Sequence, residues 1–270
     1  MIRAIARRVV PRPVRAAVLR ALKPASRLLF YRQYDSSAYW RQRASGQGQA
    51  RVMWQNEEFN ILYRRVQREL LREYVAPLHD GARVLDIGCG IGVVARMLAD
   101  LNPGVEIDAV DFPEMIAAAR REFAAPSIRY VESSAERYRD ESRQYDLILS
   151  SGCFSAIRDI PAMERAIQNA IAMLAPSGVL LMIDPFHRWN YLARAKYSSR
   201  QVIRLAAEQG LRLERKSGVL FWPTRERLAS SPLKGEALAR QFERGEWWLR
   251  RLGPHLWADY KVLVFRGRAG

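Results

Sequence analysis

Hydrophobic positions follow two different periods along the chain, and the change comes near residue 83. Between 56 and 75, apolar side chains recur at every third or fourth position, which predicts one long helix that ends before Pro77. After residue 83, short and nearly continuous apolar runs alternate with helical patterns. Such runs are typical of parallel strands that helices bury on both faces of a sheet.

The predicted elements alternate through the rest of the chain. Strands are predicted over 83–88, 106–111, 128–133, 145–151, 178–184, 211–223 and 259–267, and helices over 92–101, 113–123, 160–174 and 198–210. The last helix has Ser198 or Ser199 as its N-cap and Gly210 as its stop. We therefore predict an α/β fold, a doubly wound, mostly parallel seven-stranded sheet with helices on both faces and a helical N-terminal extension.

This order of elements suggests three parts of the chain. Residues 1–33 form a basic arm, residues 34–80 a helical cap, and residues 81–270 the sheet domain, with a helical insert around 225–257. Within the cap, residues 34–54 contain an aromatic cluster and a Gly/Gln-rich link that we expect to be a loop.

Charge adds a candidate partner. The net charge is +16, and nine basic residues with no acidic one lie between 1 and 32, which leaves +7 for the rest of the chain. With apolar residues at helical spacing between the arginines, this arm is either an interfacial helix for an anionic membrane or a solvated leader. Nucleic acid attracts such an arm too, but no separate RNA-binding module is visible, so we favour the membrane.

The sequence also indicates in which cellular compartment we expect the protein. No apolar run approaches the roughly 20 residues that span a bilayer, and arginines and prolines interrupt the N-terminus where a signal peptide would have its apolar core. The two cysteines show no metal-binding spacing with each other or with histidine, so we expect no metal site and a reducing compartment. We expect a cytoplasmic protein, peripheral at the inner membrane face if the arm binds lipid.

The stretch "VLDIGCGIG" leaves the first predicted strand and enters a helix. A glycine-rich turn at this place in a doubly wound sheet is the usual position of a nucleotide-type ligand, because glycine lets the backbone approach it closely. A dinucleotide site has the spacing G-x-G-x-x-G, whereas this turn reads Asp86-x-Gly88-x-Gly90-x-Gly92. Asp86 would repel a pyrophosphate and attract a ligand with an ammonium group.

This turn resembles motif I of the class I S-adenosylmethionine-dependent methyltransferases, and the resemblance extends from about Arg83 to Asp184. It implies that S-adenosyl-L-methionine is the cofactor and that the turn receives its methionine part. Asp111 would bind the ribose hydroxyls, Phe112 would lie against the adenine, and Ser134 with Ala135 replaces the family's Gly-Asp-Ala. The implied cofactor residues are Asp86, Gly88, Cys89, Gly90, Gly92, Asp111, Phe112, Ser134, Ala135 and Ser151, the last flanking the transferred methyl group.

Transfer to a hydroxyl requires a base, and the chain has three histidines. His187 follows the fifth strand at the active edge, whereas His79 precedes the first strand and His255 lies in the insert. We predict His187 and Asp184 as catalytic residues. The alternatives are a loop histidine that bonds to the backbone and an aspartate that caps the turn before Pro185.

Three functions follow from these observations. The first is methyl transfer to a small-molecule, saccharide or lipid-linked acceptor, at oxygen. The second is RNA methylation and the third is cofactor binding without catalysis. Aromatic residues flank the core and would form a lid over the acceptor: Tyr39, Trp40, Trp54, Trp189, Tyr191, Phe221, Trp222, Trp247, Trp248 and Trp257.

Overall fold

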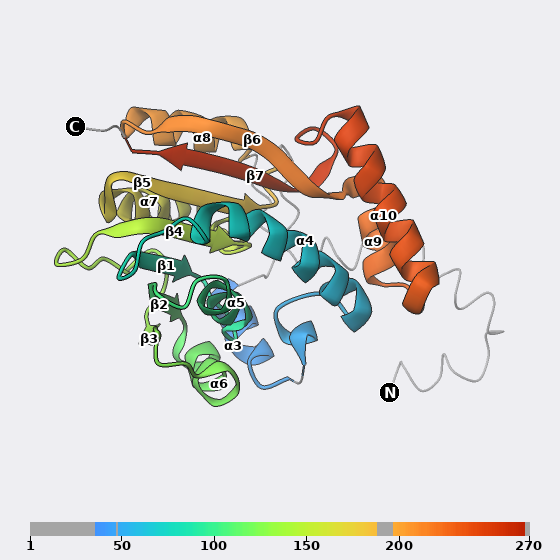
Figure 1. The fold of residues 1–270 in the computed structure, drawn as a ribbon, viewed down its shortest axis with the longest axis horizontal. Coiled ribbons are helices and arrows are strands. Elements are labelled where there is room, and N and C mark those ends of the chain that lie inside the picture. The colour runs from blue at the N-terminus through green and yellow to red at the C-terminus, as the bar shows by residue number, and fades with distance from the viewer. Residues whose placement is uncertain (1–35, 47, 188–196, 268–270) are drawn as a thin grey trace, which may run out of the picture. The chain divides into compact units, whose positions relative to one another are not determined.

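Seven strands form one sheet in the order β3-β2-β1-β4-β5-β7-β6. The computed structural model describes residues 36–46, 48–187 and 197–267. The strands are β1 (Arg83–Ile87), β2 (Glu106–Asp111), β3 (Ile128–Glu132), β4 (Tyr145–Ser151), β5 (Leu174–Asp184), β6 (Arg212–Phe221) and β7 (Ala258–Arg266). The strands β1 to β5 pair in parallel, and β7 pairs antiparallel with both β5 and β6 (Figure 1).

Helices cover both faces of this sheet. They are α3 (Ser36–Arg43), α4 (Glu57–Val75), α5 (Val93–Leu101), α6 (Pro113–Phe123), α7 (Ile160–Ala172), α8 (Ser199–Glu208), α9 (Trp222–Ala229) and α10 (Gly235–Leu252), with short 3₁₀ turns η1 (Gln49–Arg51) and η2 (Phe154–Ala156). Helices α4 and α5 lie in front of the sheet in Figure 1, and α7 and α8 lie behind it.

Alternation along each strand supplies two apolar layers. In β1, Val84 packs into the layer that includes Leu98 of α5, whereas its neighbour Leu85 packs into the layer that includes Ile167 of α7. Both strand side chains are fully buried. Because successive side chains of a strand point to opposite faces, continuous apolar runs need a helical layer on each side.

Local capping fixes where the helices begin. The side chain of Asn56 accepts a hydrogen bond from the backbone N–H of Phe59 at the start of α4. Ser198 and Gln201 form a capping box at the start of α8, which decides between the two predicted N-caps in favour of Ser198. The following Gly210 has φ +84°, as predicted for a helix stop.

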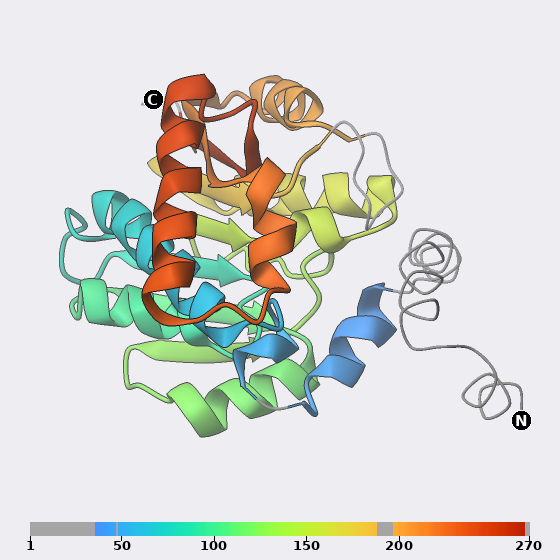
Figure 2. The same ribbon diagram turned by 90° about the vertical axis from the view of Figure 1, so that its right-hand side faces the viewer.

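The carboxyl ends of the parallel strands share one edge of the sheet, and α9 and α10 lie in front of that edge (Figure 2). Asn56 ties the start of α4 to this helical pair, because its side-chain amide donates to the carbonyls of Leu228, Ser231 and Leu233. The edge that carries the candidate site is therefore enclosed by elements from both ends of the chain.

The predicted fold class is confirmed, including seven strands and a mostly parallel sheet. Two details differ from expectation: β5 begins at Leu174, and the Gly/Gln-rich link expected to be a loop runs into the short turn η1. The last two strands pair antiparallel with α9 and α10 between them in the chain, where a helical insert was predicted. The basic arm lies outside the described residues, and the part boundaries stay predictions. No helix of the described chain is long and apolar enough to cross a membrane.

Candidate active site

The glycine turn between β1 and α5 is held in a conformation that other residues rarely adopt. Gly88, Gly90 and Gly92 have φ angles of +75°, +57° and +86°. A Cβ atom on Gly88 would overlap the Cys153 side chain, and one on Gly92 would lie 2.7 Å from the Tyr130 hydroxyl oxygen. These two glycines are therefore required by the fold itself, whatever the turn binds.

Two carboxylates flank the turn. Asp111 accepts hydrogen bonds from the backbone N–H groups of Gly90 and Phe112, each at 2.7 Å, and burial raises its pKa to about 6. Asp86 is 1% exposed, and its Oδ2 atom has no hydrogen-bond partner among the described residues. Burial and the charge of Asp111 raise the pKa of Asp86 to about 7. A buried oxygen without a donor is unfavourable, so the site favours a ligand that brings one.

Arg64 of α4 brings a positive charge to the same place, a contribution that the sequence analysis missed. Its guanidinium donates to Oε1 of Gln67 at 2.5 Å, while its Nε atom is buried with no partner among the described residues. Burial lowers the pKa of Arg64, and the charge of Asp86 acts in the opposite direction. A cation and an anion with free hydrogen-bonding atoms thus face the turn together.

The remaining predicted cofactor residues line the neighbouring strand ends. Ser134 follows β3, and its Oγ atom is buried without a partner among the described residues. Phe112 follows β2, and the Arg41 guanidinium carbon lies 4.9 Å from the centre of its ring. Cys89 is buried in the turn, where its backbone N–H donates to the Val110 carbonyl at 3.1 Å. Burial raises the pKa of the Cys89 thiol.

An aromatic cluster stands beside the end of β4. Trp54, Tyr63 and Tyr260 pack on one another with ring centroids 5.4 to 5.8 Å apart. Near it, the Ser151 hydroxyl accepts a hydrogen bond from the side-chain amide of Gln67 at 2.8 Å. The sequence analysis expected Trp54 and Ser151 here but not Tyr63, Gln67 or Tyr260. Of the other expected lid residues, Trp189 and Tyr191 lie outside the described residues.

His187 lies at the same edge and is oriented by β7. Its Nε2 atom is 2.7 Å from the carbonyl oxygen of Asp259 and 3.4 Å from Oδ1 of the same residue. Because both neighbours are acceptors, Nε2 carries a proton, and Nδ1 is the ring nitrogen left to serve as a base. Arg225 of α9 pairs with the other carboxylate oxygen of Asp259 at 2.6 Å. Burial raises the pKa of Asp259, but these two partners outweigh it and lower the pKa below its ordinary value.

Asp184 is engaged in packing the sheet edge. Its carboxylate is fully buried and accepts hydrogen bonds from the Ser150 hydroxyl at 2.8 Å, and from the Ser155 hydroxyl and backbone N–H at 2.8 and 3.1 Å. These bonds tie the end of β5 to β4 and η2. The geometry gives Asp184 a structural role and favours His187 as the base, so a catalytic role for Asp184 stays an untested prediction.

Comparison with known proteins agrees with the fold and the glycine turn. Residues 84–178 match the profile of a family described as a methyltransferase domain. This match spans the turn and both flanking carboxylates. Residues 84–178 therefore carry a methyltransferase domain, and relatives that match this region support the class I S-adenosylmethionine-dependent type. The family named from the sequence is thereby confirmed.

Individual relatives differ in what they methylate. Malonyl-[acyl-carrier protein] O-methyltransferase of Enterobacter lignolyticus is 36% identical over 125 residues, which cover 46% of each chain. Ribosomal RNA small subunit methyltransferase C of Chromohalobacter salexigens is 35% identical over 131 residues, 45% of this chain and 39% of the relative. This chain thus spans less than half of the length of these relatives.

A solved structure shares the fold. The N-methyltransferase NodS from Bradyrhizobium japonicum WM9, in complex with S-adenosyl-L-homocysteine, superimposes with a TM-score of 0.58 and 18% identity. The superposition covers 87% of this chain and 99% of NodS. At this identity the likeness shows a shared fold and nothing of the acceptor.

The predicted site residues gather at one sheet edge, and their roles in binding stay predictions. The sequence analysis missed Arg64, Gln67 and Asp259. One signal could have found Gln67: it occupies a fully buried position of α4, four residues after the buried Tyr63. A polar residue on the buried face of an amphipathic helix indicates a partner inside the protein. No group of histidine, cysteine and acidic side chains suited to a metal occurs within the described ranges.

The raised pKa of Asp86 predicts a pH-dependent stability. Its pKa is about 7 in the folded chain against an ordinary 3.8, so the folded chain binds more protons between these values. The free energy of unfolding therefore falls as the pH rises through this window. Asp86→Asn removes the charge, and we expect it to raise the unfolding free energy above pH 7 by on the order of 2 kcal/mol.

Urea unfolding of the ligand-free protein near pH 4 and above pH 7 checks this expectation. The advantage of Asp86→Asn should appear only at the higher pH. The exposed Asp100→Asn, whose residue pairs with Arg96 on the surface of α5, serves as the matched control and should show no such dependence. An equal effect of Asp86→Asn at both pH values would contradict the assignment of the charge to Asp86.

Proposed function

We propose that this protein transfers the methyl group of S-adenosyl-L-methionine to an oxygen of a small-molecule, saccharide or lipid-linked acceptor. One observation carries the proposal: the buried atoms Asp86 Oδ2 and Arg64 Nε lack hydrogen-bond partners among the described residues, and Asp86, two residues before Gly88, lies within electrostatic range of Arg64. An ammonium and a carboxylate on one ligand would satisfy both. The methionine part of the cofactor has these two groups.

The other residues of the turn fit the rest of this cofactor. Asp111 has acceptor capacity left on both carboxylate oxygens for the ribose hydroxyls, because each takes one backbone hydrogen bond. Ser134 offers its unpartnered hydroxyl to the adenine. Arg64 would hold the carboxylate and Asp86 the ammonium group. When bound, the cofactor supplies a methyl group on a positively charged sulfur.

On the acceptor side, His187 would take the proton of the acceptor hydroxyl at Nδ1. The bonds from Nε2 to Asp259 fix the ring and its tautomer, and the buried Asp259 charge would stabilise the imidazolium that forms. Trp54 and Tyr260, which are partly exposed and pack on the buried Tyr63, would offer apolar faces that orient an acceptor and exclude water.

Transfer of a labelled methyl group tests the proposal directly. The protein is incubated with methyl-labelled S-adenosylmethionine and with lipid, glycan, phenolic or RNA fractions, and calorimetry measures S-adenosylhomocysteine binding. We expect binding, and label in one of the first three fractions. Label confined to RNA would replace the proposed acceptor class. Binding without label in any fraction would indicate a non-catalytic protein, and absence of binding would contradict the cofactor site.

A further inference from the structure

Exposed aromatic residues gather on the helical pair α9 and α10, away from the glycine turn. The large hydrophobic side chains exposed in the described chain are Ile61, Trp222, Trp247, Trp248, Leu252, Leu256 and Trp257. All except Ile61 lie between 222 and 257. Single exposed apolar residues are ordinary, but a concentration of this kind marks an interaction surface.

Helix α10 divides cleanly into two faces. Leu238, Phe242, Gly245 and Leu249 are buried, and Phe242 packs on Phe59 of α4 with ring centroids 5.6 Å apart. The opposite side carries Arg240, Arg244, Trp247, Trp248 and Arg251, which we call the Trp–Arg face. The exposed Glu243 lies among them and Glu236 pairs with Arg240, so Arg244 and Arg251 supply the net positive charge. The residues of the Trp–Arg face recur at helical intervals of three and four, so they form one continuous stripe.

The tryptophans of the Trp–Arg face are held in place without being buried. The Arg251 guanidinium carbon lies 4.1 Å from the centre of the Trp247 ring, and Trp247 meets Trp248 edge to face at 4.7 Å. Trp247 and Trp248 are still 39% and 38% exposed. Tryptophan with adjacent arginine suits the headgroup region of a bilayer, where one end of the ring is apolar and the other wet.

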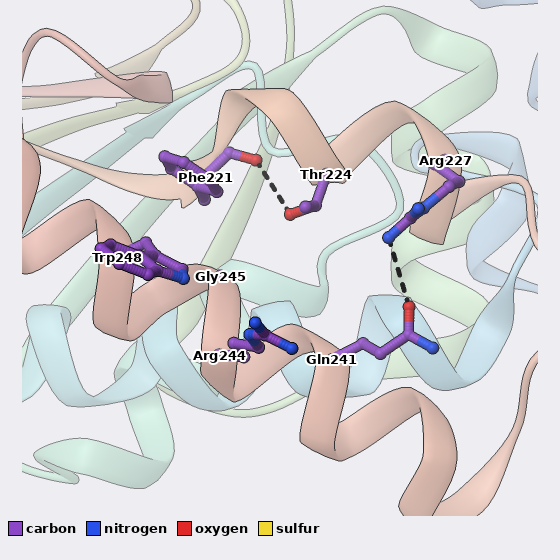
Figure 3. Close-up of a pocket in the computed structure, with 7 residues that line it drawn as sticks. All are labelled: Phe221, Thr224, Arg227, Gln241, Arg244, Gly245 and Trp248. Atoms are coloured by element: carbon purple, nitrogen blue, oxygen red, sulfur yellow. Dashed lines mark hydrogen bonds between the residues drawn. The ribbon is translucent and has the colours of Figure 1, made fainter.

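A groove of about 500 Å³ runs beside this face, between α9 and α10 (Figure 3). It is lined by Phe221, Thr224, Arg227, Gln241, Arg244, Gly245 and Trp248. The Arg227 guanidinium contacts the neutral side-chain oxygen of Gln241 at 3.4 Å, and no carboxylate lines the groove. Two arginines next to aromatic rings match a phosphate group joined to an apolar body.

We propose that the Trp–Arg face and the adjoining groove dock the protein on an anionic phospholipid bilayer. The net charge of the protein favours an anionic bilayer as the partner of this face. Each chain carries +16, so a second copy would bring like charge, and nine of the positive charges lie between residues 1 and 32, where there is no negative one. An anionic surface is the complementary partner. Docking needs no methyl transfer, so vesicle binding is measured independently of the proposed function.

Sedimentation of the full-length protein with phosphatidylcholine vesicles, with and without phosphatidylglycerol, tests the proposal. We expect binding only to the anionic vesicles. Each arginine near such a surface contributes on the order of 1 kcal/mol, so Arg244→Gln with Arg251→Gln should lower the partition coefficient about tenfold or more. Trp247→Ser with Trp248→Ser should lower it as well, through lost insertion of the rings.

Matched controls are Ile61→Ser and Arg96→Gln, exposed residues on α4 and α5 that should leave the partition coefficient unchanged. All four side chains of the test variants lie on the surface, so unchanged melting temperatures should confirm folding. Wild-type protein that ignores anionic vesicles would overturn the proposal. If both test variants bound vesicles like wild type, the proposal would also be overturned, and the binding would be assigned to residues outside this face. A change from dimer to monomer in the tryptophan variant would make the face a contact between copies instead.

Discussion

His187→Ala is expected to slow methyl transfer by about two to four powers of ten, the usual contribution of a positioned general base. Affinity for S-adenosylhomocysteine should stay unchanged, because the His187 ring is bonded to Asp259 on β7, and no hydrogen bond from it to the glycine turn occurs among the described residues. Initial rates on the acceptor fraction that takes up label, together with calorimetric titration, measure both quantities.

His79→Ala is the matched control for this experiment. His79 is exposed before β1, at the opposite edge of the sheet, and its ring contacts only the neighbouring Asp80 carbonyl among the described residues. Its replacement should leave the rate unchanged. A full rate in His187→Ala would remove His187 from the mechanism. An equal loss of cofactor affinity in that variant would give it a structural role instead.

Arg64→Met is expected to weaken S-adenosylhomocysteine binding by about ten- to a hundredfold, because hydrogen bonds to charged groups contribute roughly 1.5–3 kcal/mol. Methionine keeps much of the side-chain length and removes the charge. The ligand carboxylate would then face Asp86 without a counter-charge. Calorimetry measures the dissociation constant, and Arg64→Lys should recover part of the affinity because it restores the charge without the planar fork.

Arg96→Met on α5 controls for the loss of a surface arginine, since the exposed Arg96 side chain pairs with Asp100 at 2.9 Å. Melting curves of each variant separate binding from stability. An Arg64→Met protein that melts like wild type and binds with unchanged affinity would refute the assignment of Arg64 to the ligand carboxylate. The cofactor site would then rest on Asp86 and Asp111 alone.

Helix α9 contributes to both the proposed catalytic site and the proposed membrane-docking groove. Arg225, near its start, pairs with the carboxylate that orients His187, while Arg227 lines the groove on the outer surface. The groove at which a bilayer would bind therefore includes a residue only two positions from Arg225, on the same helix. This arrangement suits a lipid-linked acceptor, one of the classes included in the proposed function.

The sequence by itself determined the alternation of elements and the place of the glycine turn. Val84 and Leu85 are adjacent apolar residues, and only a sheet covered on both faces buries both. The turn could also be predicted from the sequence, because three glycines in five positions indicate a backbone with left-handed φ angles, which the structure has. Asp86 and Asp111 follow from the same local logic, since each lies within a residue or two of a predicted strand end.

Only the tertiary structure decided which distant side chains complete the site. Arg64 reaches the turn from a helix that precedes β1, and Asp259 reaches His187 from β7, which pairs antiparallel with β5. Neither contact produces a periodicity or a fixed residue spacing in the sequence, because both contacts depend on how helices and strands pack at the sheet edge. Asp184 shows the same limit: its position at a strand end predicted catalysis, and only the structure shows that its carboxylate also accepts hydrogen bonds from Ser150 and Ser155.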